Sequence, residues 1–373
     1  MVENYVALDL SGRRSRKVRR DQLGTMRRPG STEVVLVLVG ILAHNVASLD
    51  VGVVENNNCE GELLYNGICL PQVWPPNGSW SKQPSVPPYL QSPPSVINIS
   101  VGRQLFVDDF LLDPNLSSGV AIQYFNATYD VNNPVVSPTE PWEIGRDQNE
   151  TEAFASAFSG GIWFDPEDST YKLWYRCGNY RNVSHCLATS TDGVTWEKPS
   201  FDVVAGTNIV LNTHFDGSTV WLDGREGVPK SERFKMATVN PPYTNYTLLA
   251  SADGIHWQTR VEHSGPIEDR STIFYNPFRN RWVFSIKENI WPSFGRSRMY
   301  WEGEDLWADS QWVKGQPVPW TNADVLDPPV GCGASNTSSS GFTQLYNLDA
   351  VAYESVMVGF FSLFTGKHCG PQS

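Results

Sequence analysis

The stretch STDGVTW at 190–196 reads S-x-D-G-x-x-W, and the same pattern returns 61 residues later as SADGIHW at 251–257. Each copy follows a short apolar run, at 187–189 and at 248–250. An Asp-Gly pair favours a tight turn, because glycine tolerates a positive φ and the aspartate side chain can accept hydrogen bonds from nearby backbone N–H groups. We therefore expect each copy to join two strands, with its tryptophan covering the turn.

A weaker copy of the motif, EDLW at 304–307, and a recurring two-strand pattern extend the repeat. Paired apolar runs separated by turn residues occur at 160–164 and 171–175, at 218–223 and 233–237, at 271–275 and 281–286, and at 348–354 and 356–363. An earlier, poorly marked unit near 100–140 would contain a strand within 102–112 that two acids interrupt. Units of roughly four strands that recur along a chain are typical of the blades of a β-propeller.

The sequence therefore predicts an all-β propeller with four to five blades, the last of them incomplete. No turn motif follows the fourth strand pair before Ser373. Because a propeller buries its strand edges by closing the ring, we expect either an irregular closure or a C-terminally truncated chain, and we favour truncation. The alternative is a large all-β protein of another architecture that contains two similar hairpins.

The composition suits a β-rich protein with many loops. The 373 residues include 26 prolines and 30 glycines, and 12% of them are aromatic against 18% charged. This profile is typical of extracellular β proteins rather than helical ones. The formal net charge of −12 argues against nucleic acid as a partner, because phosphate binding needs a basic surface.

Cysteine and asparagine positions favour an oxidising compartment. Six cysteines allow 15 pairings, of which proximity in the sequence favours Cys59–Cys69, Cys177–Cys186 and Cys332–Cys369. Eight N-x-S/T glycosylation sites begin at Asn77, Asn98, Asn115, Asn126, Asn149, Asn182, Asn245 and Asn336. Disulfides together with this density of sites are typical of a secreted glycoprotein.

The first 48 residues carry eight basic residues, followed by an apolar run at 34–43. This run is short for a membrane helix, which needs about 20 residues, and with the small residues at 46–48 it resembles a secretory signal. We predict a signal peptide at 1–48 and secretion. Retention as a type II membrane anchor is the alternative, and a membrane is a partner only in that case. A Cys- and Pro-rich leader at 49–95 and a propeller domain at 96–373 complete the predicted organisation.

Candidate acids precede or lie within the first strands of successive units. In a propeller these strands line the central channel, so acids that are remote in sequence can meet there. Glycoside hydrolysis needs one carboxylic acid to protonate the leaving oxygen and a second carboxylate to attack carbon or activate water. An acid before a strand is also a common turn residue. The catalytic candidates are Asp269, Asp349, Glu354 and Asp216, and the substrate-binding candidates are Arg270, His214 and Glu152.

The order of strand, D-P-x-D turn, Y-K-x-W-Y strand and S-x-D-G-x-x-W motif resembles the five-bladed propeller glycoside hydrolases of families 32 and 43. It is most similar to the uncharacterised family-32-like proteins. The resemblance is carried by Gly160–Tyr175, Leu187–Pro199, Asp216–Ala237 and Tyr346–Phe364. It implies a five-bladed propeller that hydrolyses or transfers furanosides and pentosides at the channel mouth, using three acids.

The chain departs from the family 32 patterns at each catalytic motif. Ala153–Gly161, the stretch comparable to W-x-N-D-P-N-G, contains no acid. The R-D-P triplet falls at Asp269-Arg270-Ser271 with acid and base reversed, and E-C-P falls near Asn347-Leu348-Asp349 with aspartate in place of glutamate. The resemblance therefore transfers the scaffold better than the catalytic residues.

Two functions remain open at this point. In the first, a secreted glycoside hydrolase-like protein uses Asp269 as base or stabilising carboxylate, Arg270 as substrate clamp, and Asp349 or Glu354 as acid. In the second, a non-catalytic carbohydrate-binding or interaction propeller has kept the scaffold and lost the active site. Carbohydrate is the expected partner. No H-E-x-x-H spacing or phosphate-binding glycine loop predicts a metal or a cofactor.

Overall fold

The computed structural model describes residues 5–7, 59–144 with several short gaps, 153–327 with gaps at 180–181, 214–216, 240–241 and 243, and 343–364. Nearly all of its regular structure is antiparallel β-sheet, in four sheets that follow one another along the chain. The helices are single turns: α1 (Pro88–Gln91), α2 (Pro141–Ile144) and the 3₁₀ turn η2 (Lys230–Glu232). The prediction of an all-β fold is confirmed.

The first sheet contains β2 (Ala153–Ser156), β3 (Ile162–Asp165), β4 (Thr170–Asn179), β5 (Asn182–Ser190) and β6 (Ile209–Leu211). Strands β2 and β3 both pair with β4, so together they form the first strand of a four-strand meander. The segment between them, which includes Phe158 and Ser159, forms a bulge, because residues 157–161 lie opposite only residues 174 and 175 of β4. The predicted Cys177–Cys186 disulfide joins β4 to β5 and is confirmed, with a Cα–Cα distance of 5.8 Å.

The second and third sheets repeat this meander. The second contains β7 (Thr219–Leu222), β8 (Phe234–Val239), β9 (Tyr246–Ser251) and β10 (Gln258–Val261), hydrogen-bonded in sequence order. The third contains β11 (Thr272–Asn276), β12 (Arg281–Ile290), β13 (Gly295–Gly303) and β14 (Val318–Thr321). Three consecutive up-and-down sheets of four strands each are the arrangement that the repeat predicted.

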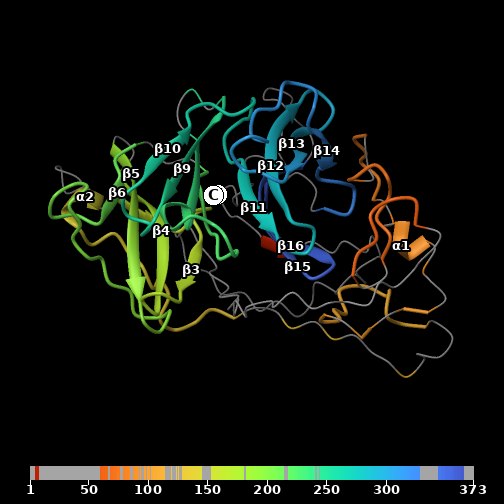
Figure 1. The fold of residues 1–373 in the computed structure, drawn as a ribbon, viewed down its shortest axis with the longest axis horizontal. Helices are drawn as coiled ribbons and strands as arrows, with labels where there is room; N and C mark the ends of the chain where they lie inside the picture. The colour runs from red at the N-terminus through yellow and green to blue at the C-terminus, as the bar shows by residue number, and fades with distance from the viewer. Residues whose placement is uncertain are drawn as a thin grey trace, which may run out of the picture.

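The fourth sheet contains β15 (Gln344–Tyr353), β16 (Val356–Phe364) and the short β1 (Tyr5–Ala7), which pairs with the far edge of β16. Figure 1 shows β15 and β16 beside the third sheet, and β1 against them. Apart from 5–7, the predicted signal region 1–48 lies outside the described residues, as do Cys332, Cys369 and six of the eight glycosylation sites. Of the two described sites, Asn182 is exposed and Asn245 is half-buried.

The two copies of S-x-D-G-x-x-W form the same turn, as predicted. In the first, the backbone N–H groups of Val194 and Thr195 donate to Asp192 Oδ1 at 2.8 and 2.7 Å. In the second, those of Ile255 and His256 donate to Asp253 Oδ1 at 2.8 and 2.9 Å. In both copies the serine hydroxyl also bonds the aspartate and accepts from the glycine N–H. These bonds span at most three residues, which explains why the sequence alone predicts them.

The sheets pack through layers of aromatic and aliphatic side chains, because every central strand alternates residues towards one neighbouring sheet and then the other. Trp174 of β4 is fully buried against Phe234 of β8, and its Nε1 donates to the carbonyl of Gly254 in the second turn motif, at 2.9 Å. The interface between the second and third sheets is built on Tyr246 and Trp282. The turn of one sheet therefore rests on the core of its neighbour.

Successive first strands lie side by side. The N–H of Val220 in β7 donates to the carbonyl of Gly160, and the hydroxyl of Thr272 in β11 donates to the carbonyl of Leu348 in β15, each at 3.0 Å. A Cβ added to Gly217, before β7, would lie 2.7 Å from Cα of Arg270, before β11. The inner strands of all four sheets thus approach one another, which is the geometry that brings remote residues together.

The Cys- and Pro-rich leader packs on the third and fourth sheets (Figure 1, orange). The predicted Cys59–Cys69 disulfide is present. Glu62 pairs with Arg279 at 2.8 Å, and Arg279 is also held by Glu302 at 2.5 Å. Residues 102–112 form no strand, contrary to expectation. Instead Asp108 is buried and accepts a hydrogen bond from Tyr89 at 2.5 Å, so this segment serves to hold the leader together.

Candidate functional site

The two ends of the sheets differ in chemistry. We call the end that carries the S-x-D-G-x-x-W turns the turn end, and the opposite end, where β2, β7, β11 and β15 begin, the strand-start end. Residues 268–270 lie just before β11, Tyr346 lies near the start of β15, and Asp349 lies at its middle. Most of the described charged residues that the sequence singled out lie at the strand-start end.

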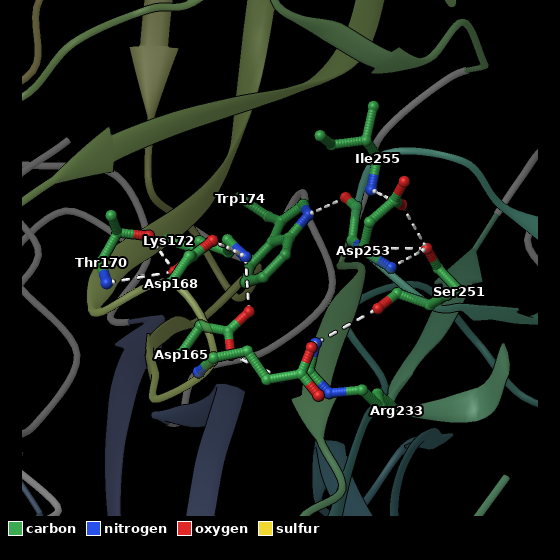
Figure 2. Close-up of polar contacts among 12 residues, drawn as sticks. Asp165, Asp168, Thr170, Lys172, Trp174, Arg233, Ser251, Asp253 and Ile255 are labelled. Atoms are coloured by element: carbon green, nitrogen blue, oxygen red, sulfur yellow. Dashed lines mark hydrogen bonds and ion pairs between the residues drawn. The ribbon is translucent and has the colours of Figure 1, made fainter. Parts of the chain in front are cut away.

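At the turn end, two buried carboxylates are each held by two cations. Asp165, at the end of β3, is 1% exposed and pairs with Lys172 and Arg233, each at 2.5 Å (Figure 2). Asp223, just after β7, pairs in the same way with Arg225 at 2.7 Å and Lys235 at 2.9 Å. Burial raises the pKa of both acids, but these cations outweigh it and leave each pKa below its usual value. Because each of these carboxylates is paired with two cations inside the fold, we assign both a structural role.

The strand-start end gathers a second set of charged residues, which we call the strand-start cluster. Its members come from the segment before β11, from the paired ends of β12 and β13, and from β15. They are Glu268, Asp269, Arg270, Lys287, Arg296, Arg298, Tyr346 and Asp349.

Asp269 and Glu268 are tied to β12. Asp269 is 31% exposed and forms an ion pair with Lys287, which is only 3% exposed. Burial lowers the pKa of Lys287, and the nearby charge of Asp269 opposes that shift. Glu268 accepts a hydrogen bond from the Asn289 side chain, and burial raises the pKa of Glu268 above its usual value. Glu268 was not singled out from the sequence, although its position next to Asp269 was a usable signal.

Asp349 occupies the middle of the cluster. Its carboxylate accepts a hydrogen bond from Asn347 Nδ2 at 3.0 Å. Burial raises the pKa of Asp349, against the opposing effects of the Ser159 hydroxyl, Arg298, Asn347 and Arg270. Because Ser159 belongs to the first sheet and Asp349 to the fourth, the cluster lies where the first and last sheets meet.

Arg270 adopts a left-handed backbone conformation with φ of 62°. Its guanidinium lies 3.7 Å from the ring centroid of Phe158 and 5.4 Å from that of Tyr346, so residues of the first and fourth sheets flank it. Arg298 holds the backbone on both sides of the Arg270 side chain. Its two terminal nitrogens donate to the carbonyls of Arg270 at 2.7 Å and Tyr346 at 2.9 Å. A left-handed residue costs of order 1 kcal/mol, which such contacts offset.

Arg298 is the functional candidate that the sequence did not indicate. It is 0% exposed in the middle of β13, and burial lowers its pKa to about 10. The carboxylates of Asp349 and Asp269 each act in the opposite direction and raise that pKa. The only available signal was the alternation of Arg296 and Arg298 on one face of a strand, which is unusual for a buried strand.

The structure separates Glu354 from the other candidates. Glu354 lies in the turn between β15 and β16, at the turn end, where Tyr65 donates to it and Arg103 pairs with it at 3.2 Å. It therefore anchors the leader and does not approach Asp349, five residues earlier in the same hairpin. Glu152, His214 and Asp216 lie outside the described residues.

Two further observations bound the chemistry of the described residues. No group of three or more histidine, cysteine, aspartate or glutamate side chains in this part of the chain could hold a metal ion. Within the same residues, no helix is both long and apolar enough to cross a membrane.

The buried His185 shares a hydrogen-bond network with Ser218 and Thr238, at 2.9 and 3.1 Å, in the core between the first two sheets.

Comparisons of sequence return nothing: no family model matches the chain, and no curated protein is significantly similar to it. Solved structures do match, and they include fructofuranosidases and an endo-arabinase. The chain is similar to a fructofuranosidase from Schwanniomyces occidentalis solved with fructose, at 16% identity and a TM-score of 0.35, over 59% of this chain and 47% of that one.

Two other matches are of the same degree. The GH32 β-fructofuranosidase BmSUC1 of Bombyx mori is 14% identical, with a TM-score of 0.36, over 57% of this chain and 44% of that one. The endo-arabinase of Bacteroides thetaiotaomicron is 14% identical, with a TM-score of 0.39, over 57% of this chain and 71% of that one. The chain thus spans less than half the length of the two fructofuranosidases.

Proposed function

We propose that this protein is a secreted, glycoside hydrolase-like propeller of the five-bladed type, with its active site at the strand-start cluster. Asp269 and Asp349 come from neighbouring sheets, and the buried Arg298 joins their segments, because it donates to the carbonyl of Arg270, next to Asp269, and to that of Tyr346, in the strand of Asp349. This convergence of two carboxylates at one end of the inner strands is the observation that supports the proposal. The resemblance of the motifs to families 32 and 43 supports it independently.

The surroundings of the two carboxylates suit different roles. Burial raises the pKa of Asp349, so its proton is retained to higher pH, as a general acid requires. Asp269 is 31% exposed and lies just before an inner strand, in an ion pair with Lys287, so a substrate can reach it as the proposed base or nucleophile. Arg270, flanked by Phe158 and Tyr346, is the substrate clamp. A furanoside or pentoside is the proposed substrate, and glycoside bond hydrolysis the proposed reaction.

The test is an activity assay on the full chain, produced by a secretory host so that its disulfides form. Aryl furanosides and pentosides are the substrates, and wild type is compared with Asp269→Asn and Asp349→Asn. We expect each substitution to lower kcat by about 10²- to 10⁴-fold, the range for loss of an acid or base catalyst. Glu354→Gln is the matched control, because the structure places that acid at the leader, and its kcat should stay within about twofold of wild type.

A pH profile separates the two roles. In wild type, kcat should fall as pH rises through the pKa of Asp349, because a general acid must be protonated to donate. The Asp349→Asn variant should lack this fall in kcat at high pH. Hydrolysis that survives both substitutions unchanged would exclude this site. A wild-type protein that binds sugars but cleaves none would instead support the second candidate, a carbohydrate-binding propeller, which the departure of Asp269-Arg270-Ser271 from the R-D-P triplet favours.

A further inference from the structure

One tryptophan differs from all the others in its exposure. The chain has 14 tryptophans, all of them within the described residues, and Trp291 alone is exposed, at 43%. The others are buried or half-buried, and many of them build the cores between the sheets. Exposing an indole forgoes more hydrophobic stabilisation than exposing a smaller side chain, and tryptophans are enriched at surfaces that bind partners. Trp291 is therefore a candidate binding residue.

Trp291 lies at the strand-start end. It directly follows β12, in the short hairpin loop that leads into β13. Within β12, Lys287 forms the ion pair with Asp269. Two residues further on, the Asn289 side chain donates to Glu268. Side chains two residues apart in a strand lie on the same face, and Trp291 is two residues beyond Asn289. Position 291 thus continues the face of β12 that bonds the segment before β11.

The loop that carries Trp291 is packed between the leader and the fourth sheet. At its other end, the ring of Phe294 lies 6.2 Å from the ring of Trp80 in the leader, measured between centroids. The next residue, Gly295, has a φ of 61°, and a Cβ added to it would lie 2.6 Å from Oε1 of Gln344 in β15. A loop fixed in this way presents its side chains at a defined place, so less conformational entropy is lost when a ligand binds.

We infer that Trp291 is a stacking platform for a sugar ring, and that the substrate of the strand-start cluster is an oligosaccharide. The flat faces of a sugar ring carry C–H groups that pack on an aromatic ring, while the hydroxyls at its edge bond polar groups. The ring on Trp291 is additional to the ring that Asp269 and Asp349 would act on. This inference rests on the proposed function for the choice of a sugar as ligand, whereas the exposure and position of Trp291 stand on the structure.

Iodide quenching of tryptophan fluorescence tests the inference without any need for turnover. Iodide reaches exposed indoles, so the quenchable part of the fluorescence comes chiefly from Trp291. The probes are arabinotriose and kestose, with arabinose and fructose as their single-ring counterparts. We expect a trisaccharide to protect the indole and to bind about 10-fold more tightly than the single sugar, the scale for burial of about 50–60 Å² of apolar surface. Titrations in the Asp269→Asn background keep the trisaccharide intact if the protein hydrolyses it.

The variants are Trp291→Ala and Trp291→Phe, with Phe164→Ala as the matched control. Phe164 in β3 is also 43% exposed, but it lies at the turn end. By calorimetry, Trp291→Ala should lose about 10-fold in trisaccharide affinity and keep its single-sugar affinity within about twofold. Trp291→Phe should retain most of the trisaccharide affinity, because a ring can still stack. The control should retain both affinities. Thermal unfolding shows that each variant is folded, and Trp291→Gln takes the place of Trp291→Ala if that variant does not fold.

The outcomes distinguish this inference from the proposed function. Trisaccharide binding that depends on Trp291, without hydrolysis, leaves the inference standing while the proposed hydrolase activity fails. Hydrolysis of aryl glycosides together with unchanged trisaccharide affinity in Trp291→Ala overturns the inference and leaves the proposed function standing. Equal affinity for a trisaccharide and its single sugar, or an indole that neither trisaccharide protects from iodide, overturns the inference as well.

Discussion

The turn end and the strand-start end use the same residue types to opposite effect. At the turn end, Asp165 and Asp223 each receive two cations, and the pattern repeats from the first sheet to the second. Among the described residues of the strand-start end, Asp269 pairs with Lys287, whereas Glu268 and Asp349 accept hydrogen bonds from the Asn289 and Asn347 amides. A buried acid paired with two cations in each of two successive sheets indicates a joint between sheets, whereas the strand-start arrangement occurs once, where the inner strands meet, as a functional site would.

The difference follows from what each end must do. A buried ion pair contributes little stability over a well-packed apolar pair, but breaking one by removal of a single partner is strongly destabilising. The turn end can accept that arrangement because every charge is satisfied within the fold. The strand-start cluster keeps Arg298 buried at a cost in stability, and function is the usual reason for such a cost.

The largest loss of folding stability is expected for a substitution at the turn end. Asp165→Asn leaves Lys172 and Arg233 without their shared carboxylate, so it should lower the free energy of unfolding by about 3–5 kcal/mol. Asp168→Asn is the control, since Asp168 also pairs with Lys172, at 2.7 Å, but is 48% exposed and should cost about 1 kcal/mol or less. Urea unfolding measures both. If both variants lost the same free energy of unfolding, the buried Asp165 pairs would contribute no more to stability than the exposed Asp168 pair, contrary to our expectation.

A smaller effect is expected at the opposite end. Arg298→Met removes a buried charge together with two hydrogen bonds, so relief of the desolvation cost and loss of the bonds partly cancel. We expect the free energy of unfolding in urea to fall by about 1–2 kcal/mol, less than for Asp165→Asn. A loss as large as that of Asp165→Asn would mean that Arg298 is fully compensated, and the contrast between the two ends would be wrong.

The smallest effect concerns the repeated turns and depends on pH. Burial raises the pKa of Asp253, but hydrogen bonds from the side chain and backbone of His256 and the N–H of Ile255 prevail and lower it to about 2. A carboxyl whose pKa is lower in the folded than in the unfolded chain contributes stability above about pH 4, which is lost as pH falls to about 2.

Because Asp253 is 45% exposed, solvent reduces this contribution to roughly 1 kcal/mol. We therefore expect Asp253→Asn to lower the free energy of unfolding by roughly 1 kcal/mol at pH 7 and by much less near pH 2. Thermal unfolding of both proteins across this range measures it. A difference that stays constant with pH would show that the lost bonds, and not the charge, account for the effect.

The sequence predicted whatever depends on near neighbours in the chain. The two turn motifs form because their bonds join residues at most three apart, and the two described disulfides close loops of 9 and 10 residues. It also predicted Asp269 and Arg270 at the start of an inner strand, because strand order can be read from alternation and turn residues. It missed Glu268 and Arg298, and it placed a strand at 102–112 where the chain is irregular.

Tertiary structure alone decided which charged side chains are buried and which groups surround them. Asp349 and Glu354 are five residues apart and similar in sequence context, yet one lies beside Arg298 and the other holds the leader at the opposite end of the hairpin. Arg298 acquires its role from carbonyls 28 and 48 residues away. Local hydrogen bonds can be inferred from spacing, whereas desolvation and charge balance depend on every group that folding brings near, and those groups are distant in the chain.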